Sequence, residues 1–257
     1  MLTKRPTCVI LCEPNSREDT EIITPDQVIF RESVYNAVTL NPLALYDFID
    51  FDAWLNTIIP AELSFSGPKY LPFTPNLSHG STKIIRRRMA LLIGAWVGTK
   101  CAEASRPKVY ELLLSLLTPL DTRNDVVVRM SAATALQCAV DEWQFKPEDF
   151  LTYLEAFLIG TCAEEDKGGI IGLMAFVGHI EARMRLVRVV EVIVERMDRR
   201  VFTTLCWKLT HVDYSVCAFD HEFVAIFVGA KSRATDIQSG GAECPQDDNW
   251  GISSATM

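Results

Sequence analysis

The chain has 257 residues, of which 49% are hydrophobic and 23% charged, and its formal net charge at pH 7 is −8. This composition is normal for a chain that buries a core. Its acidity argues against bulk binding to nucleic acid or anionic membranes and favours basic protein partners. The eight cysteines form no CxxC pair and no metal-type spacing to a histidine, which is typical of reduced, intracellular thiols.

Neither a targeting segment nor a membrane span is predicted. The apolar run within MLTKRPTCVILC is shorter than the roughly 7–15 residues of a signal-peptide core. No stretch approaches the roughly 20 apolar residues of a spanning helix. We therefore expect a soluble chain that begins with an irregular lead over residues 1–24.

The first helices are predicted from capping residues and spacing. Thr24 is a good N-cap, Pro25 suits the first helical position, and Gln27 closes a capping box. The apolar face of this helix is expected to comprise Phe30, Val34, Ala37 and Val38. A second helix runs from Asp50 to an end at Pro60, with an apolar stripe of Phe51, Trp54, Leu55, Ile58 and Ile59. The segment 64–80 is rich in proline and glycine and is predicted to be a loop inserted within one repeat.

Two later helices carry the same apolar template 43 residues apart. The first template is Ile85, Met89, Leu92, Ile93 and Trp96, and the second is Val128, Ala132, Ala135, Leu136 and Ala139. A third helix lies between them, with a stripe of Val109, Leu112, Leu113, Leu116 and Leu117. Helix pairs repeated every 40–47 residues or so are typical of HEAT and armadillo solenoids. The sequence therefore predicts an all-α, α-α superhelix of about four helix pairs over residues 25–201.

The pattern continues beyond the second template and then stops. A helix opens at 145–150, and a glycine-rich helix follows over 168–181, where Ile171 lies 43 residues after Val128. The last predicted helix buries Leu186, Val189, Val190, Ile193, Val194 and Met197. Residues 202–257 remain unassigned, and from Lys231 onward we expect a disordered tail.

Four stretches carry a resemblance to a known family: AVTLNPLALYDFIDFDAWL (37–55), KIIRRRMALLIGAWV (83–97), RPKVYELLLSLLTPLDTRNDVVVRMSAATALQCAVDEWQF (106–145) and KPEDFLTYLEAFL (146–158). They resemble the central HEAT repeats of the importin-β (karyopherin-β) family, most closely its importin-eleven branch. The resemblance covers about residues 28–201. Members of this family are several times longer, so the chain is expected to be an internal piece of such a protein.

The resemblance implies a nuclear transport receptor that shuttles between nucleus and cytoplasm. Its implied partners are cargo proteins, the phenylalanine-glycine repeats of pore proteins and the GTPase Ran, whose main site in the family lies in N-terminal repeats that this chain lacks. Nucleic-acid binding, membrane insertion and a cofactor are not expected. The alternative is a generic HEAT scaffold that organises other proteins without transport.

Arginines supply the candidate binding residues. Arg86, Arg87 and Arg88 are consecutive, so they span about 200° of a helix and cannot share one face. They could bond carbonyls and acids between repeats, or contact an acidic partner protein. Arg129 follows Asp125 by four residues and is expected to form an ion pair or an inter-repeat ladder, with partner binding as the alternative.

The tryptophans also allow a structural and a binding interpretation. Trp54, Trp96 and Trp143 are predicted to be core residues, with peptide binding as the alternative. The four histidines have no cysteine or carboxylate at ligand spacing, and GxSxG, P-loop and HExxH motifs are absent from the sequence. The sequence thus predicts a protein that acts by surface recognition, without catalysis or a bound metal.

Overall fold

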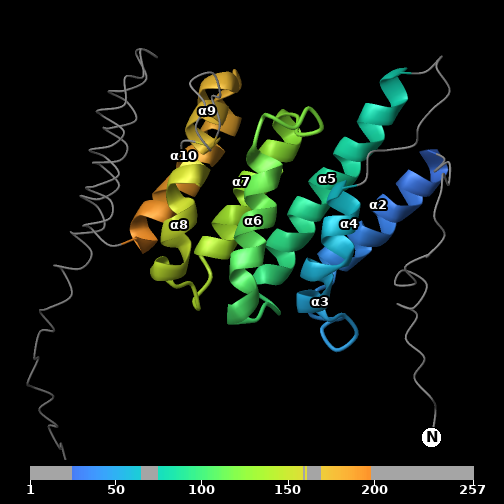
Figure 1. The fold of residues 1–257 in the computed structure, drawn as a ribbon, viewed down its shortest axis with the longest axis horizontal. Helices are drawn as coiled ribbons and strands as arrows, with labels where there is room; N and C mark the ends of the chain where they lie inside the picture. The colour runs from blue at the N-terminus through green and yellow to red at the C-terminus, as the bar shows by residue number, and fades with distance from the viewer. Residues whose placement is uncertain (1–24, 65–74, 159, 161–168, 198–257) are drawn as a thin grey trace, which may run out of the picture. The chain divides into compact units, whose positions relative to one another are not determined.

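The computed structural model describes residues 25–64, 75–158, 160 and 169–197 (Figure 1). All of them belong to the first of two compact units, Met1–Tyr214, whereas the second unit, Ser215–Met257, lies outside the described residues, as do the predicted lead and the unassigned C-terminal segment. The elements are α2 (Pro25–Leu40), α3 (Phe51–Asn56), α4 (Ile58–Ser64), α5 (Pro75–Val97), the 3₁₀ helix η1 (Glu103–Ser105), α6 (Arg106–Leu117), α7 (Val126–Val140), α8 (Pro147–Leu158), α9 (Gly169–Phe176) and α10 (Ile180–Arg196).

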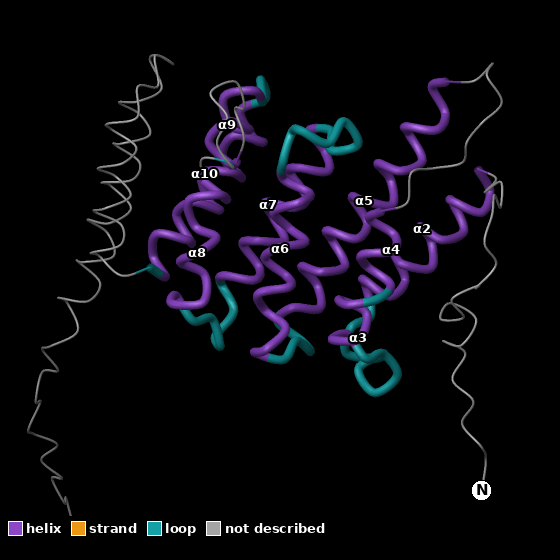
Figure 2. The backbone as a smooth tube through the Cα atoms, in the orientation of Figure 1, coloured by secondary structure: helices purple, strands orange, loops and turns teal. Residues whose placement is uncertain are grey.

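The helices form two packed layers (Figures 1 and 2). In layer A, α5 packs between α2 and α7, and α7 packs between α5 and α10. Layer B contains α3, α4, α6 and α8, with α4 against α5, α6 against α7, and α8 against α6. Since α5 and α7 each pack against the layer B helix before them and against the layer A helices on both sides, the predicted all-α array of helix pairs is confirmed.

The two apolar templates line the core between the layers. All five residues of the first template are at most 1% exposed, and all five of the second are at most 2% exposed. Trp96 shows how this core connects successive pairs. Its indole N–H donates to the carbonyl oxygen of Val38 at 3.1 Å, and its ring stacks on Phe51 with centroids 5.8 Å apart. A single side chain of α5 therefore contacts both α2 and α3.

Helices α5 and α7 approach each other closely because small residues face each other at their contact. A Cβ added at Gly94 would lie 3.1 Å from the Cα of Ala135 and 3.2 Å from its Cβ. Glycine in a helix costs about 1 kcal/mol relative to alanine. That cost is offset here by the packing that the short separation allows.

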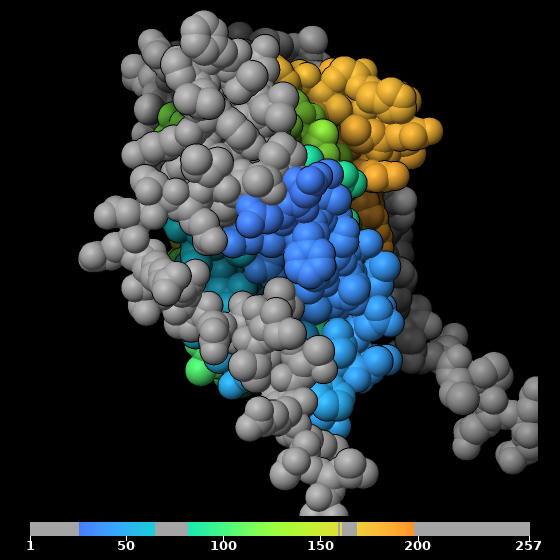
Figure 3. All heavy atoms as spheres, turned by 90° about the vertical axis from the view of Figure 1, so that its right-hand side faces the viewer, coloured from blue at the N-terminus to red at the C-terminus, as the bar shows by residue number. Residues whose placement is uncertain are grey.

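The buried face of α2 differs from the predicted one. Val28, Tyr35 and Val38 are buried, but Phe30 is 64% exposed and Ala37 is also exposed. Tyr35 sets the rotation, since its ring lies edge-on to Trp54 and its hydroxyl donates to Glu62. Among the described helices of layer A, α2 is covered by α5 on one side, and its other side forms the end of the described array (Figure 3).

Proline acts differently from the prediction at two places. Pro60 does not end the helix but sits in the first turn of α4, and the break falls at Thr57. A proline cannot donate to the carbonyl four residues earlier and clashes with it, yet it is tolerated in a first helical turn. The predicted loop 64–80 is also too long, since α5 already begins at Pro75, for the same first-turn reason. Residues 65–74 lie outside the described part of the chain.

The repeat weakens after α8. The predicted helix over 168–181 ends at Phe176, and a separate helix, α10, packs against α7. Ile171 is only half-buried, whereas Ile170 is fully buried, so the template does not carry over at a spacing of 43. The predicted stripe of α10 is nevertheless confirmed, since all six of its residues are buried.

Candidate functional site

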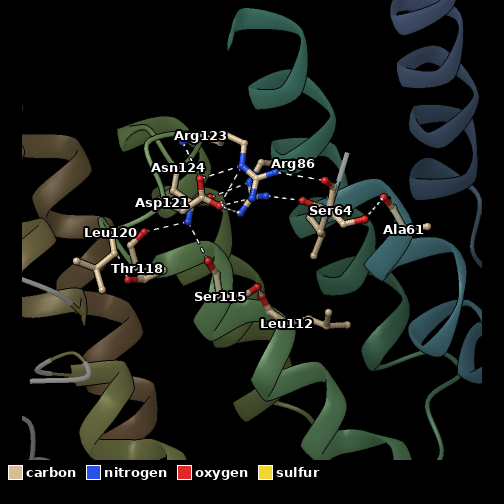
Figure 4. A network of polar contacts seen from close by, with 11 residues as sticks. Ala61, Ser64, Arg86, Leu112, Ser115, Thr118, Leu120, Asp121, Arg123 and Asn124 are labelled. Atoms are coloured by element: carbon tan, nitrogen blue, oxygen red, sulfur yellow. Dashed lines mark hydrogen bonds and ion pairs between the residues drawn. The ribbon is translucent and has the colours of Figure 1, made fainter. Parts of the chain in front are cut away.

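Arg86 occupies the centre of a polar network at the junction of two helix pairs (Figure 4). Its side chain is 3% exposed. Its Nε donates to Oδ1 of Asn124 at 2.9 Å, one terminal nitrogen donates to the carbonyl oxygen of Leu63 at 2.6 Å, and the other lies 3.0 Å from Oδ2 of Asp121. One guanidinium therefore joins α4, α5 and the loop between α6 and α7.

Asp121 is shared by two arginines. Nε of Arg123 donates to its Oδ1 at 2.9 Å, and a terminal nitrogen of Arg123 donates to its Oδ2 at 2.7 Å, beside the Arg86 contact. These hydrogen bonds from Arg123, opposed by partial burial and aided by the charge of Arg86, hold the pKa of Asp121 below its ordinary value. The carboxylate therefore stays ionised and keeps both arginines in place.

Asn124 completes the junction by satisfying the end of α6. Its amide nitrogen donates to the carbonyl oxygens of Ser115 and Thr118 at 2.8 and 2.9 Å, while its Oδ1 accepts from Arg86. The last carbonyls of a helix lack partners within the helix. Asn124, which is 6% exposed, thus caps one helix and orients the arginine of another.

Arg129 repeats the role of Arg86 one period later. Its Nε donates to the carbonyl oxygen of Leu117 at 2.8 Å, at the end of α6, and the residue is 6% exposed. Asp125 caps α7 by accepting from the backbone N–H of Val128 at 3.0 Å and lies 3.7 Å from Nζ of Lys83. The Arg129 bond joins α7 to α6 of the same helix pair, and the Lys83–Asp125 contact joins α7 to α5 of the preceding pair.

The four predicted binding residues are therefore not equivalent. Arg88 donates to Glu32 at 2.9 Å and joins α5 to α2. Arg86 and Arg129 are buried and bond to carbonyl oxygens of the preceding helix, as the structural interpretation of these arginines expects, and partner contact stays the alternative. Of the four, Arg87 is the residue whose side chain is exposed.

Arg87 belongs to an exposed stripe on layer A that was not predicted. Ile84, three residues earlier on α5, is 48% exposed, and Val127, 43 residues after Ile84, is 50% exposed on α7. Because α5 and α7 pack side by side, the helices place this apolar and basic stripe on neighbouring repeats. Ile84 and Val127 stand 43 residues apart in the sequence, but their hydrophobicity alone does not show that they are exposed.

The tryptophans also separate into two groups. Trp54 and Trp96 are 5% and 0% exposed, which confirms them as core residues. Trp143 is 80% exposed, so its assignment to the core was wrong. It lies in the short loop between α7 and α8, where Glu142 forms a buried ion pair with Arg106 and also accepts from the backbone N–H of Gln144 at 2.9 Å. The residues on both sides of Trp143 are thereby fixed, and the indole faces solvent.

Cys101 lies near this ion pair, and its surroundings disfavour the ionised thiol. Burial raises the pKa of the Cys101 thiol to about 12, with Asp52 adding to the effect, so the reactive thiolate is scarce at neutral pH. In the described ranges, histidine, cysteine and acidic side chains form no group of three suited to a metal ion. The described helices also include none long and apolar enough to cross a membrane.

Paired helices in two layers, joined by buried arginines at repeated positions, define an α-solenoid of the HEAT type. The fold is similar to that of Lph2, described as a bidirectional nuclear transport receptor of S. cerevisiae. The match has a TM-score of 0.56 at 20% identity over 80% of this chain and 19% of that one.

Comparison with curated sequences gives the family. The chain is 30% identical over 182 residues to importin-11 of Mus musculus and 29% identical to importin-11 of Homo sapiens, in each case over 71% of this chain. It is also 30% identical over 129 residues, or 50% of the chain, to the importin beta-like protein KAP120 of Saccharomyces cerevisiae, of which it covers 11%. No family model matches.

These matches, together with the solenoid fold, place the chain in one family: it belongs to the importin-β family. It spans 16% of the length of the two importin-11 relatives.

Proposed function

We propose that the chain is a segment of a nuclear transport receptor that binds cargo proteins and the phenylalanine-glycine repeats of pore proteins during Ran-dependent import into the nucleus. The observation that carries this proposal is the exposed stripe of Ile84, Arg87 and Val127, presented by helices that buried arginines hold at a fixed spacing. The similarity in sequence to importins supports it. The protein then acts by recognition, without catalysis, and shuttles between nucleus and cytoplasm.

Two kinds of partner are expected for a surface of this type. Arg87 adds an exposed guanidinium to apolar neighbours on layer A, a combination that suits an acidic and partly apolar cargo surface. Phenylalanine side chains of pore-protein repeats would enter apolar grooves between neighbouring helices, where a short peptide gains affinity from burying one aromatic ring. Ran is proposed as a partner of the whole receptor on the family relation alone.

The test is retention on immobilised phenylalanine-glycine repeat peptides, with peptides in which serine replaces each phenylalanine as the control. We expect retention by the phenylalanine peptides and flow-through on the serine peptides. Flow-through on both would favour the alternative, a HEAT scaffold without transport activity. Cargo recognition by the stripe is tested separately: Arg87→Glu should weaken capture of an acidic cargo, and Arg87→Lys should retain most of it.

A further inference from the structure

Thr122 stands at the tip of the loop that carries the Arg86 network. The backbone N–H of Asn124 donates to the carbonyl oxygen of Asp121 at 2.8 Å, which closes a tight turn with Thr122 and Arg123 at its two central positions. Thr122 is exposed, whereas Asn124 is buried beneath it. An enzyme that modifies hydroxyl groups can therefore reach this threonine, and the modified side chain would lie directly beside the shared carboxylate of Asp121.

An acidic residue follows Thr122 at a spacing that protein kinases recognise. Asp125 stands three residues after Thr122. Kinases select their substrates partly by the charges around the acceptor hydroxyl, and one class of serine/threonine kinases selects acidic residues that follow the acceptor. Asp125 caps α7 and also lies 3.7 Å from Nζ of Lys83, yet its side chain is still 37% exposed. Its charge is therefore available to a kinase as well.

Two other threonines of the described helices and loops have an acidic residue at the same spacing but lie in different surroundings. Thr118 precedes Asp121 by three residues, but it is half-buried and its hydroxyl oxygen accepts from a backbone N–H at 3.4 Å. Thr152 precedes Glu155 and is exposed, but it lies within α8. A kinase binds the acceptor segment in an extended form, so helical hydrogen bonds would first have to open. Fewer backbone bonds hold the turn at Thr122, which makes it the better acceptor.

We propose that Thr122 is a phosphorylation site for an acid-directed serine/threonine protein kinase, and that its phosphate loosens the Asp121 junction. In this reaction Oγ1 of Thr122 forms a bond to the γ-phosphorus of ATP, the bond from that phosphorus to the β–γ bridging oxygen breaks, and ADP leaves. The hydroxyl proton passes to a base of the kinase. The product carries a charge of about −1.5 to −2 at neutral pH.

The phosphate acts in opposite senses on the two neighbours of Thr122. It repels the ionised carboxylate of Asp121 and attracts the guanidinium of Arg123. The Arg123 side chain is 28% exposed and can turn toward the phosphate, whereas that of Arg86 is 3% exposed and is held in place. Arg123 then gives up its bonds to both oxygens of Asp121 and to the carbonyl oxygen of Ser64 (Figure 4). The junction keeps one arginine and loses the other.

The site is tested by incubating the full chain with a purified acid-directed kinase and ATP, and locating the phosphate by mass spectrometry of the digested protein. We expect phosphate on Thr122, and none on the Thr122→Ala variant at that position. Asp125→Asn should slow transfer to Thr122 by about 10-fold or more, because it removes the charge that the kinase recognises while asparagine still caps α7. Glu155→Gln is the matched control and should leave transfer to Thr122 unchanged.

The effect on the junction is tested by thermal unfolding of the treated and untreated chain. Phosphorylation should lower the melting temperature by about 2–4 °C, the shift that the loss of one partly exposed ion pair gives in a chain of this size. Treated Thr122→Ala should melt like untreated Thr122→Ala, which controls for phosphate elsewhere. In Asp121→Asn the carboxylate that the phosphate repels is gone, so phosphorylation should lower the melting temperature less.

Three results would each overturn the proposal: absence of phosphate from Thr122, equal transfer to the Asp125→Asn variant, or a chain phosphorylated at Thr122 that melts no lower than the untreated one. None of these measurements uses cargo or pore-protein peptides, so their outcome does not depend on the proposed function.

Discussion

Arg86 and Arg129 stand 43 residues apart and make the same contact, each donating to the backbone carbonyl of a residue at the end of the preceding layer B helix, Leu63 and Leu117 respectively. A repeated polar bond thus joins the two helices of each of these pairs, α4 with α5 and α6 with α7, in addition to the apolar template. Arginine suits this place because its planar guanidinium can serve several acceptors at once.

Removal of Arg86 should destabilise the array. Arg86→Met leaves the Leu63 carbonyl and the Asn124 oxygen without their donor and takes one cation from Asp121. Losing buried, charge-assisted hydrogen bonds of this kind costs about 2–4 kcal/mol. The measurement is urea unfolding followed by circular dichroism, with Arg87→Met as the control, since that residue is exposed and should change the free energy of unfolding by less than about 0.5 kcal/mol. Equal effects of the two changes on the free energy of unfolding would show that the buried bonds of Arg86 do not stabilise the array.

The close approach of α5 and α7 gives a second prediction. Gly94→Val should destabilise the protein by about 1–3 kcal/mol, because its added atoms would press on the Ala135 backbone. Gly98→Ala is the control, since its Cβ would meet only Cγ of Glu142, at 3.5 Å. That change should be neutral or stabilising by up to about 1 kcal/mol. If Gly94→Val unfolds at the same urea concentration as the unaltered protein, the helices do not pack as closely as described.

The second apolar template is tested with a charge. Leu136 is fully buried, so Leu136→Asp would bury an unpaired carboxylate and should unfold the array in one cooperative step, since neighbouring pairs stabilise each other. Thr134→Asp places the same charge two residues away at an exposed position and should melt almost normally. A thermal unfolding curve that Leu136→Asp leaves unchanged would show that this face of α7 is not buried.

Acid should weaken the Asp121 junction. The pKa of Asp121 is lower in the folded protein than in the unfolded chain, so its contribution to stability is complete above about pH 4. That contribution is lost as pH falls through the lowered value. Urea unfolding between pH 6 and pH 2 should therefore show a steeper loss of stability for the unaltered protein than for Asp121→Asn. Parallel curves would mean that Arg86 and Arg123 do not favour the ionised carboxylate.

The sequence correctly predicted burial where the apolar residues of a helix follow a regular spacing. It failed where one particular side-chain contact determines which residues are exposed. Trp96 follows the apolar template, so its burial was predictable from spacing. Trp143 lies in a loop whose backbone is fixed by Arg106, 36 residues before Glu142, and spacing carries no signal for such a pair. Phe30 was misplaced for a related reason, since Tyr35 and its partners turn α2 about its axis.

The candidate site shows the same limit. Consecutive arginines indicated that Arg86, Arg87 and Arg88 could not share a face, and the structure does place them differently. The sequence alone could not assign Arg86 to Asp121 and Asn124, because those acceptors lie in a loop more than thirty residues away. Exposure of Ile84 and Val127 depends likewise on which helices neighbour α5 and α7.

The Arg86 network has a mechanical consequence. Its bonds cross from α4 and α5 to the next helix pair, so a change of angle between those pairs would have to break them. At the joint beyond α7, the exposed Arg196 of α10 donates to the carbonyl oxygen of Asp141 at 2.7 Å. Because an exposed bond is weaker than a buried one, compliance should be greater at that joint than at the one before it.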